Sequence, residues 1–258
     1  MRYASLASGS KGNCHAIADG ERILLIDAGI SFLQIRSRLE GLNWRLDQVR
    51  GLAVTHEHTD HINAIPVILK KTDWTILATP NTLRAIEISK GLEIPKRRCI
   101  PLTPGRSENW EGWLLSPFAV PHDAVDPVAY RIEAAGLSLG VITDLGYPTA
   151  LAVEYARSLD FLALESNHDI AMLREGPYPP MLKARILSRV GHLSNEACAE
   201  FLQNIISPAL KNVTLVHLSE QNNDPAMARL ASAGVLAQSG GDVALGVATQ
   251  GEALEILL

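Results

Sequence analysis

Cysteine is scarce in this sequence. Cys14, Cys99 and Cys198 are the only three among 258 residues, they are widely spaced, and no CxxC pair occurs. This argues against a disulfide framework and favours a reducing compartment. The N-terminus also lacks the apolar segment of a signal peptide, and the longest apolar runs, such as ILLI and GLAV, are too short to cross a bilayer. We therefore expect a cytoplasmic protein without a membrane partner.

A strong charge of either sign is also missing. The net charge is −5 and the pI is about 5.9, so the field of the whole molecule does not by itself indicate a nucleic-acid binder. A local basic patch can outweigh such a weak net charge. Candidates for a basic path along a polynucleotide are Arg174, Lys183, Arg185 and Arg189. The KRR run at 96–98 is more simply explained as a solvated surface.

Repeats, low-complexity tracts and linkers are absent from the sequence. Segments with the pattern of buried strands alternate with helical segments in both halves. The main helices are expected at 31–39, from Asp60 to 71 with a bend or stop at Pro66, at 80–89, at 148–158, at 181–190, after the N-cap Ser194, and at 224–233. We expect one α/β domain, residues 1–258, in which two sheets pack against each other with helices outside.

The strongest functional signal is VTHEHTDHI, which directly follows a buried strand. It places His56, His58, Asp60 and His61 within six residues. Imidazoles at i and i+2 of an extended segment point the same way, so the first two can share one metal ion. The next two turn into a helix and can bind a second ion, since zinc readily takes imidazole nitrogen and carboxylate oxygen. The alternative is a solvated loop that merely carries four polar residues, and the HxHxDH spacing disfavours it.

Three more candidate ligands follow apolar strands. His122 ends LLSPFAVPH, Asp144 ends LGVITD and His217 ends VTLVH. A single histidine in such a place is more often a packed or surface residue. Together with HxHxDH, however, the three residues indicate that strand ends converge on one edge with enough ligands for two metal ions.

This ligand set resembles that of the metallo-β-lactamase-fold hydrolases, and the DAG segment with Asp27 resembles the first motif of that superfamily. The resemblance covers nearly the whole chain. It implies an α/β fold, a four-layer αβ/βα sandwich, with two divalent metal ions at one edge of the sheets and Asp27 as support. The ligand set that it implies is His56, His58 and His122 for the first ion, Asp60, His61 and His217 for the second, and Asp144 as the bridge.

Further segments narrow this resemblance. Asp144 stands where the best-known zinc β-lactamases carry cysteine, and His58 stands where the flavin-associated diiron branch carries glutamate. ALESNHD and GHLSNEACAEF resemble motifs of ribonuclease Z-type phosphodiesterases, but only 22 residues separate His122 from Asp144, which leaves no room for a tRNA-binding arm. LASGSKGNC, TDLGY, ESNHDIAMLREGPYP and VGHLSNE resemble the bacterial YycJ (WalJ) group. That resemblance implies a 5′ to 3′ exonuclease with DNA as its partner.

The working hypothesis is metal-assisted hydrolysis of a phosphodiester by a hydroxide that bridges the two ions. The leaving oxygen needs a proton, and His192 is the candidate general acid. The plain alternative for His192 is a histidine that only hydrogen-bonds near the start of the Ser194-capped helix. Asp60 is the second candidate catalytic residue. The candidate substrate contacts are His168, Asn167, Ser10 and Asn13.

A thioesterase like glyoxalase II, or a phosphodiesterase of small molecules, is the alternative function, because the same metals serve an acyl substrate. Zinc is the favoured metal, and manganese or iron fit the same ligands. The choice of DNA over RNA and the polarity of cleavage rest on the resemblance alone. The sequence leaves open whether the chain forms a homodimer.

Overall fold

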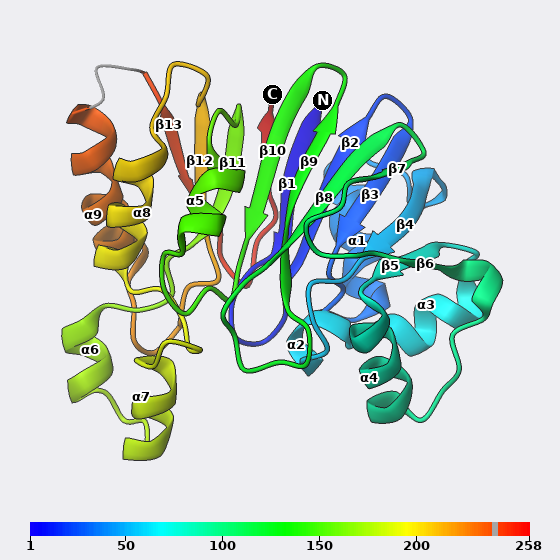
Figure 1. Cartoon of the computed structure of the whole chain (residues 1–258), viewed down its shortest axis with the longest axis horizontal. Helices are drawn as coiled ribbons and strands as arrows, with labels where there is room; N and C mark the ends of the chain where they lie inside the picture. The colour runs from blue at the N-terminus through cyan, green and yellow to red at the C-terminus, as the bar shows by residue number, and fades with distance from the viewer. Residues whose placement is uncertain (239–241) are drawn as a thin grey trace.

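Two seven-stranded β-sheets face each other in this computed structural model, which describes residues 1–238 and 242–258 (Figure 1). The first sheet has the order β14-β1-β2-β3-β4-β5-β6, with the bounds Leu254–Leu257, Arg2–Ala7, Cys14–Asp19, Arg22–Ile26, Val49–Ala53, Thr75–Ala78 and Cys99–Pro101. The second sheet has the order β13-β12-β11-β10-β9-β8-β7, with the bounds Ala244–Val247, Asn212–Val216, Phe161–Glu165, Leu137–Ile142, Val128–Ala134, Trp113–Ala119 and Glu108–Trp110.

Helices cover the outer face of each sheet (Figure 1). Those on the first sheet are α1 (Phe32–Gly41), α3 (Ile65–Lys71) and α4 (Pro80–Lys90), and those on the second are α5 (Ala150–Ala156), α8 (Asn195–Ile205) and α9 (Pro225–Gln238). The short helices α2 (Thr59–Ile62), α6 (Ile170–Glu175) and α7 (Pro180–Ile186) lie along the lower edge of Figure 1, and the 3₁₀ turns η1 and η2 span Leu46–Gln48 and Lys96–Arg98. Across the described residues, no helix combines the length and the apolar character needed to cross a membrane.

Three buried apolar clusters separate these layers. Tyr3, Tyr130 and Phe161 are fully buried between the two sheets. Ile35 of α1 belongs to the cluster under the helices of the first sheet, and Phe201 of α8 to the cluster under those of the second. The central strands are therefore covered on both faces, which is why RILLI and FLALE are continuous apolar runs rather than alternating ones. The four-layer αβ/βα sandwich predicted from the sequence is confirmed.

Local sequence signals explain where several helices begin. Ser31 caps α1 and forms a capping box with Gln34. Thr79 caps α4, whose first residue is a proline, as the sequence predicts. The helix predicted from Asp60 onward is split into α2 and α3, and Pro66 lies in the first turn of α3, where a missing N–H costs nothing.

Other features differ from the sequence-based expectation. The pattern does not predict β6, β7 and α6, because three to six residues are too few for periodicity to be visible. The helix predicted at 181–190 ends at Ile186, because the N–H of His192 donates to the Ile186 carbonyl (3.1 Å) and turns the chain toward the sheets. In the KRR run, Arg98 is buried and donates to the carbonyl oxygen of Trp74 (3.0 Å), so it braces the start of β5 instead of facing solvent.

The parallel strands end at one edge of the sandwich. β3 runs parallel to β4 in the first sheet, and β10, β11 and β12 run parallel in the second. Asp27 and His217 directly follow β3 and β12, and Asp144 follows β10 after one residue. His56 lies in the short segment between β4 and α2, and α2 is at the bottom of Figure 1. The topology thus brings side chains that are distant in sequence to a single place.

Tyr130 ties the second sheet to this edge. Its buried hydroxyl donates to the carbonyl oxygen of Val54 (2.7 Å), two residues before His56. Tyr130→Phe leaves that carbonyl without its donor, so we expect the free energy of unfolding, measured by urea denaturation, to fall by about 1–2 kcal/mol. Tyr155→Phe is the control, since the hydroxyl of Tyr155 has no hydrogen bond within the described residues. An equal loss in both variants would contradict this explanation.

Candidate metal centre

The backbone of α2 is fixed against the loop that follows β3. His58 is the N-cap of α2, and the N–H of Ala28 donates to the carbonyl oxygen of His61 (2.7 Å). A Cβ at Gly29 would lie 1.6 Å from the carbonyl oxygen of Asp60, so only glycine fits where the two segments meet. This close contact sets the direction in which the side chains of HxHxDH leave the backbone.

Three imidazoles converge on one side of the site. Nδ1 of His58 lies 3.0 Å from Nε2 of His56 and 3.3 Å from Nε2 of His122. Three ring nitrogens around one point match the ligands of a divalent metal ion. Burial, and then the neighbouring imidazoles, hold the pKa of His56 well below its ordinary value, so this ring is in the neutral form that binds metal.

A second group converges on the other side, with Asp144 between the two. Oδ2 of Asp60 lies 3.5 Å from Nε2 of His61 and 3.8 Å from Nε2 of His217. Oδ2 of Asp144 is 3.3 Å from Nε2 of His61, and its Oδ1 is 3.6 Å from Nε2 of His122. Asp144 therefore has the position of a ligand shared by two cations.

Among the described residues, two buried polar atoms of this centre have no hydrogen-bond partner: Oδ2 of Asp144 and Nε2 of His217. Leaving such atoms unpaired costs about 1–3 kcal/mol each, and more for a charged group. Both residues belong to clusters of His, Asp and Glu ligands whose nearest atoms all lie within 4.8 Å of one another. Two divalent cations would satisfy both atoms, so the residues present fit the two-ion centre expected from the sequence.

Asp27 holds His61 in position. Its Oδ2 accepts hydrogen bonds from Nδ1 of His61 (2.7 Å) and from the hydroxyl of Thr55 (2.8 Å), which leaves Nε2 of His61 for the centre. Burial by itself lowers the pKa of His61, but Asp144, Asp27 and Asp60 outweigh it and raise the pKa to about 9. The carboxylates thus create a field that attracts positive charge.

Glu165, at the end of β11, is the residue that sequence reasoning misses. Its Oε1 accepts from Nδ1 of His192 (2.7 Å) and from Nδ1 of His217 (2.8 Å), and its Oε2 accepts from the N–H groups of Leu145 and Leu193. Burial alone raises the pKa of Glu165, but the two histidines hold it below its ordinary value. A sequence signal for Glu165 was nevertheless present, because this residue ends an apolar strand and the predicted ligands also follow apolar strands.

His192 lies between the two ligand groups. Its ring centroid is 5.2 Å from that of His122 and 5.1 Å from that of His217, and its side chain is 20% exposed. Glu165 occupies its Nδ1, and within the described residues its Nε2 has no partner. His192 is thus held beside the centre with one ring nitrogen open, an arrangement that suits a proton donor.

The chain reaches the centre through strained turns. Asp27, Asp144 and His217 all have positive φ, at 61°, 57° and 58°. Each stands where a strand ends, and the left-handed conformation turns the backbone there. Such conformations are uncommon for residues other than glycine and are concentrated at functional sites.

The predicted substrate contacts divide into two kinds. Ser10 and Asn167 line a cavity beside His192. Asn13 is buried, and its amide nitrogen lies 3.2 Å from Nε2 of His61, the ring nitrogen that faces the centre. His168 is also buried, and burial lowers its pKa to about 4, so it brings no positive charge to an anion at neutral pH.

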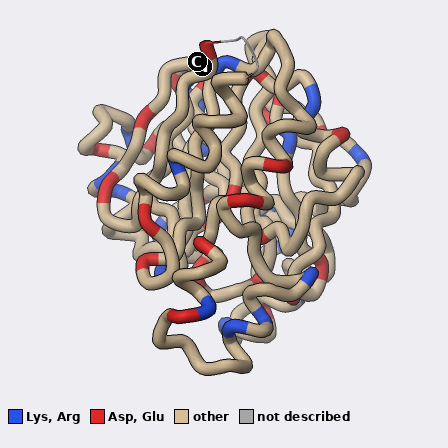
Figure 2. The backbone as a smooth tube through the Cα atoms, turned by 90° about the vertical axis from the view of Figure 1, so that its left-hand side faces the viewer, with Lys and Arg blue, Asp and Glu red and all other residues tan. Residues whose placement is uncertain are grey.

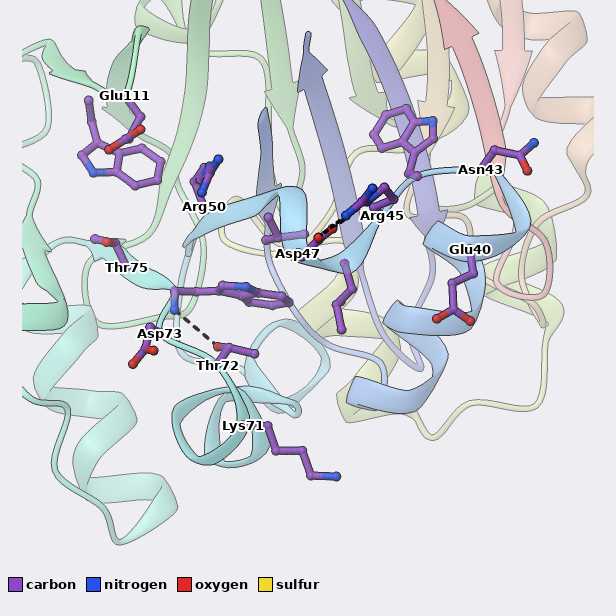
Figure 3. A pocket seen from close by; sticks show the side chains of 15 residues that line it. Glu40, Asn43, Arg45, Asp47, Arg50, Lys71, Thr72, Asp73, Thr75 and Glu111 are labelled. Carbon is purple, nitrogen blue, oxygen red and sulfur yellow. Dashed lines mark hydrogen bonds and ion pairs between the residues drawn. The ribbon is translucent and has the colours of Figure 1, made fainter. Parts of the chain in front are cut away.

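A larger cavity lies elsewhere. Its volume is about 1000 Å³, and Figure 3 shows Arg50 of β4 and Lys71 at the end of α3 among its lining residues. Arg50 is at the start of β4, whereas His56 follows the end of that strand, so the cavity and the histidines are at opposite ends. Acidic and basic side chains are mixed around it, among them Asp47 and Asp73, and we assign it no role in the chemistry.

Comparison with known proteins agrees with this geometry. A family model described as a β-lactamase superfamily domain matches residues 22–218. Exodeoxyribonuclease YycJ of Bacillus anthracis is 35% identical over 256 residues, 99% of this chain and 94% of the relative. Exodeoxyribonuclease WalJ of Streptococcus pneumoniae is 35% identical over 248 residues, 96% and 91% of the two chains. The chain belongs to the YycJ/WalJ group of the β-lactamase superfamily. The resemblance inferred from the sequence is therefore confirmed.

Solved structures of the superfamily share the fold at low sequence identity. The metallo-β-lactamase fold protein YhfI of Bacillus subtilis superimposes with a TM-score of 0.72 at 15% identity and covers 99% of both chains. The short form of human tRNase Z gives a TM-score of 0.65 at 15% identity and covers both chains completely. These matches support the four-layer architecture.

Removing the negative charge of Asp144 should reduce metal binding. We expect the wild type to hold two ions per chain and Asp144→Asn to hold at most one, because the amide cannot bridge two cations. Elemental analysis after gel filtration measures the ratio. A chelator should destabilise the wild type by about 3 kcal/mol per ion at metal concentrations near 100 times the Kd, and the variant by less. The exposed Asp47→Asn is the control, and full metal content in Asp144→Asn would contradict the bridge.

Replacing Glu165 tests the support of both histidines. Glu165→Gln removes the charge that two imidazole N–H groups share, so we expect metal affinity at the second group, or turnover, to fall by about 10- to 100-fold. Glu200→Gln, on the exposed face of α8, should leave both quantities unchanged. Isothermal titration with zinc and a steady-state assay separate the two effects. If neither quantity moves, Glu165 does not orient the site.

Proposed function

We propose that this protein is a two-metal phosphodiesterase, and more narrowly a DNA exonuclease that works from 5′ to 3′. The observation that carries the proposal is the Glu165–His192 pair beside a ligand set sufficient for two ions. The ions, when bound, supply Lewis acidity and lower the pKa of a bound water. In the proposal, His56, His58 and His122 would hold one ion, Asp60, His61 and His217 would hold the other, and Asp144 would be shared by both.

The need for an acid separates the candidate reactions. A sugar alkoxide is a poor leaving group and has to be protonated as the bond to phosphorus breaks. A thiolate is a good leaving group, because the pKa of a thiol is only about 8.5, far below that of an alcohol. It therefore leaves without a proton donor. A glyoxalase II-like thioesterase therefore needs no acid at the position of His192. It would also not need the hydrogen bond by which Glu165 orients that ring. This favours the phosphodiester over the thioester.

In this proposal Glu165 and His192 work as a pair. The carboxylate accepts from Nδ1, which fixes the ring and leaves Nε2 to hold the proton that the leaving oxygen takes up. Because Glu165 also holds His217, the acid and the second ligand group keep a fixed distance. Asp60, the second candidate catalytic residue, contacts His61 and His217, and its side chain is partly exposed at the site.

The names of the relatives favour DNA among phosphodiesters. Two proteins that align with more than nine-tenths of this chain carry the name exodeoxyribonuclease. The proposed ions are zinc, with manganese or iron as alternatives that the same nitrogen and oxygen ligands accept. We further propose a cytoplasmic enzyme, since all three cysteines are unpaired. A homodimer stays a prediction.

The central test is His192→Ala. We expect the variant to keep its metal content and to lose about 10²- to 10⁴-fold in kcat on DNA, because the leaving alkoxide loses its acid. On bis-p-nitrophenyl phosphate, whose leaving group needs little protonation, the loss should be much smaller. Both activities are measured with and without a chelator, and a thioester substrate is run in parallel.

Three results would contradict the proposal in different ways. Loss of metal from His192→Ala makes His192 a ligand. Equal losses on both phosphodiesters exclude a role as acid. Thioester cleavage by the wild type without phosphodiester cleavage, tested with zinc, manganese and iron, excludes the nuclease altogether.

A further inference from the structure

A cavity of about 200 Å³ opens beside the metal centre. Two of its lining residues reach the ligands directly. Nδ1 of His192 lies 3.5 Å from Oδ1 of Asp144, and Oδ1 of Asp123 lies 3.4 Å from Nε2 of His122. A group that fills this cavity is therefore next to the proposed proton donor, which is the side of the site where a leaving group has to lie.

The walls of the cavity are of two kinds. Tyr178 and Leu182, from the α6–α7 segment, provide an aromatic ring and an aliphatic side chain. Polar side chains come from the loops around the strand ends: Ser10, Asn167 and Ser219. Nucleobases stack on aromatic side chains, and hydroxyl and amide groups hydrogen-bond to sugar and phosphate oxygens. This combination suits one nucleotide, and the volume leaves no room for a duplex.

Arg185 is the cation among the described residues that line the cavity. Its Nε donates to Oδ2 of Asp123, which holds the guanidinium at the rim, and its side chain is 53% exposed. The two terminal nitrogens have no protein partner within the described residues. A guanidinium anchored through Nε still offers a pair of donors, the geometry that suits a phosphate.

The segment that carries Arg185 differs in charge from the rest of the molecule. Residues 170–190 hold four basic side chains and one acidic one, a net charge of +3, whereas the whole chain has −5. In Figure 1, α6 and α7 project from the lower edge, and Figure 2 shows lysine and arginine segments along the lower part of the molecule. A positive projection beside a metal centre favours a polyanionic substrate.

We propose that this cavity binds the 5′-terminal nucleotide of the DNA, with its base on Tyr178 and Leu182 and its 5′-phosphate on Arg185. The inference rests on the proposed function. Water adds its oxygen to the next phosphorus and releases one proton to the solvent, from which His192 is reprotonated afterwards. The bond between that phosphorus and the 3′-oxygen of the bound nucleotide breaks. The 3′-oxygen takes a proton from His192. The nucleotide leaves with a free 3′-hydroxyl, and the shortened chain keeps the phosphate on its new 5′ end.

This assignment explains how the site would select chain ends. The two unpartnered terminal nitrogens of Arg185 suit a terminal 5′-phosphate, which carries more negative charge and one more free oxygen than an internal phosphodiester, so the cavity would favour a chain end over an internal bond. Each cut also leaves a new 5′-phosphate, and Arg185 then binds the end that the previous cut produced. Arg185 and Tyr178 are accordingly positioning residues that decide which bond is cut.

The test measures the KM of Arg185→Ala on one oligonucleotide that carries either of two 5′ ends, a phosphate or a hydroxyl. On a 5′-phosphorylated single strand, we expect KM to rise by about tenfold or more relative to the wild type, from the loss of a charge-assisted contact. On the same strand with a 5′-hydroxyl, the rise should be several-fold smaller. Arg36→Ala, on exposed α1, is the matched control and should behave as the wild type on both.

A second variant tests the base contact and guards against misfolding. Tyr178→Ala should raise KM on both ends, and Tyr178→Phe should restore it, because the ring and not the hydroxyl stacks on the base. Melting temperature and metal content confirm that each variant is folded. If Arg185→Ala does not fold, Arg185→Lys and the Tyr178 pair carry the test.

The outcomes separate this inference from the proposed function. A wild type that cleaves no phosphodiester overturns the proposed function. A wild type that degrades DNA, with Arg185→Ala affected equally on both ends and Tyr178→Ala unaffected, overturns only the assignment of the cavity. Degradation of closed circular single strands by the wild type at the rate of linear ones also overturns it.

Discussion

Buried negative charge is the constraint from which the rest of this structure follows. An ionised carboxylate is stable away from water only when it is paired, hydrogen-bonded or bound to a cation. Asp27, Asp144 and Glu165 are all buried at one edge of the sandwich. Two of them accept hydrogen bonds from imidazole N–H groups, whereas one oxygen of Asp144 has no hydrogen-bond partner among the described residues. The convergence of histidines around Asp144 makes sense only with positive charge between them.

Much of this arrangement is readable in the sequence, because the signals are local. HxHxDH is contiguous, and His122, Asp144 and His217 each follow an apolar run that predicts a buried strand. Parallel strands then bring these ends together. What the sequence does not reveal are contacts between distant segments. Glu165 receives no role from its neighbours in the chain, since its two histidines are 27 and 52 residues away.

The same reason applies to other contacts of the site. The amide of Asn13 lies against His61, and the amide of Asn167 donates to the backbone carbonyl oxygen of His217, contacts that bring together loops distant in sequence. The hydroxyl oxygen of Ser8 accepts a hydrogen bond from the backbone N–H of His217, which is more than 200 residues away in the sequence. Arg98 is buried because it donates to the backbone carbonyl oxygen of Trp74, a contact that no sequence pattern predicts. Residue type and spacing predict the candidate ligands, whereas the hydrogen bonds that orient them become visible only in the folded structure.

The left-handed backbone at Asp27, Asp144 and His217 has a consequence for how this protein loses order. A residue with a side chain pays conformational energy of the order of 1 kcal/mol to stay in that region, and here three such turns meet at one edge. In the proposed two-ion centre, bound cations would offset that energy. Without them, the edge is the natural starting point for partial unfolding, while the strands behind it stay protected. Amide hydrogens at the strand ends would then report metal occupancy by their exchange rates, long before the sheets themselves respond.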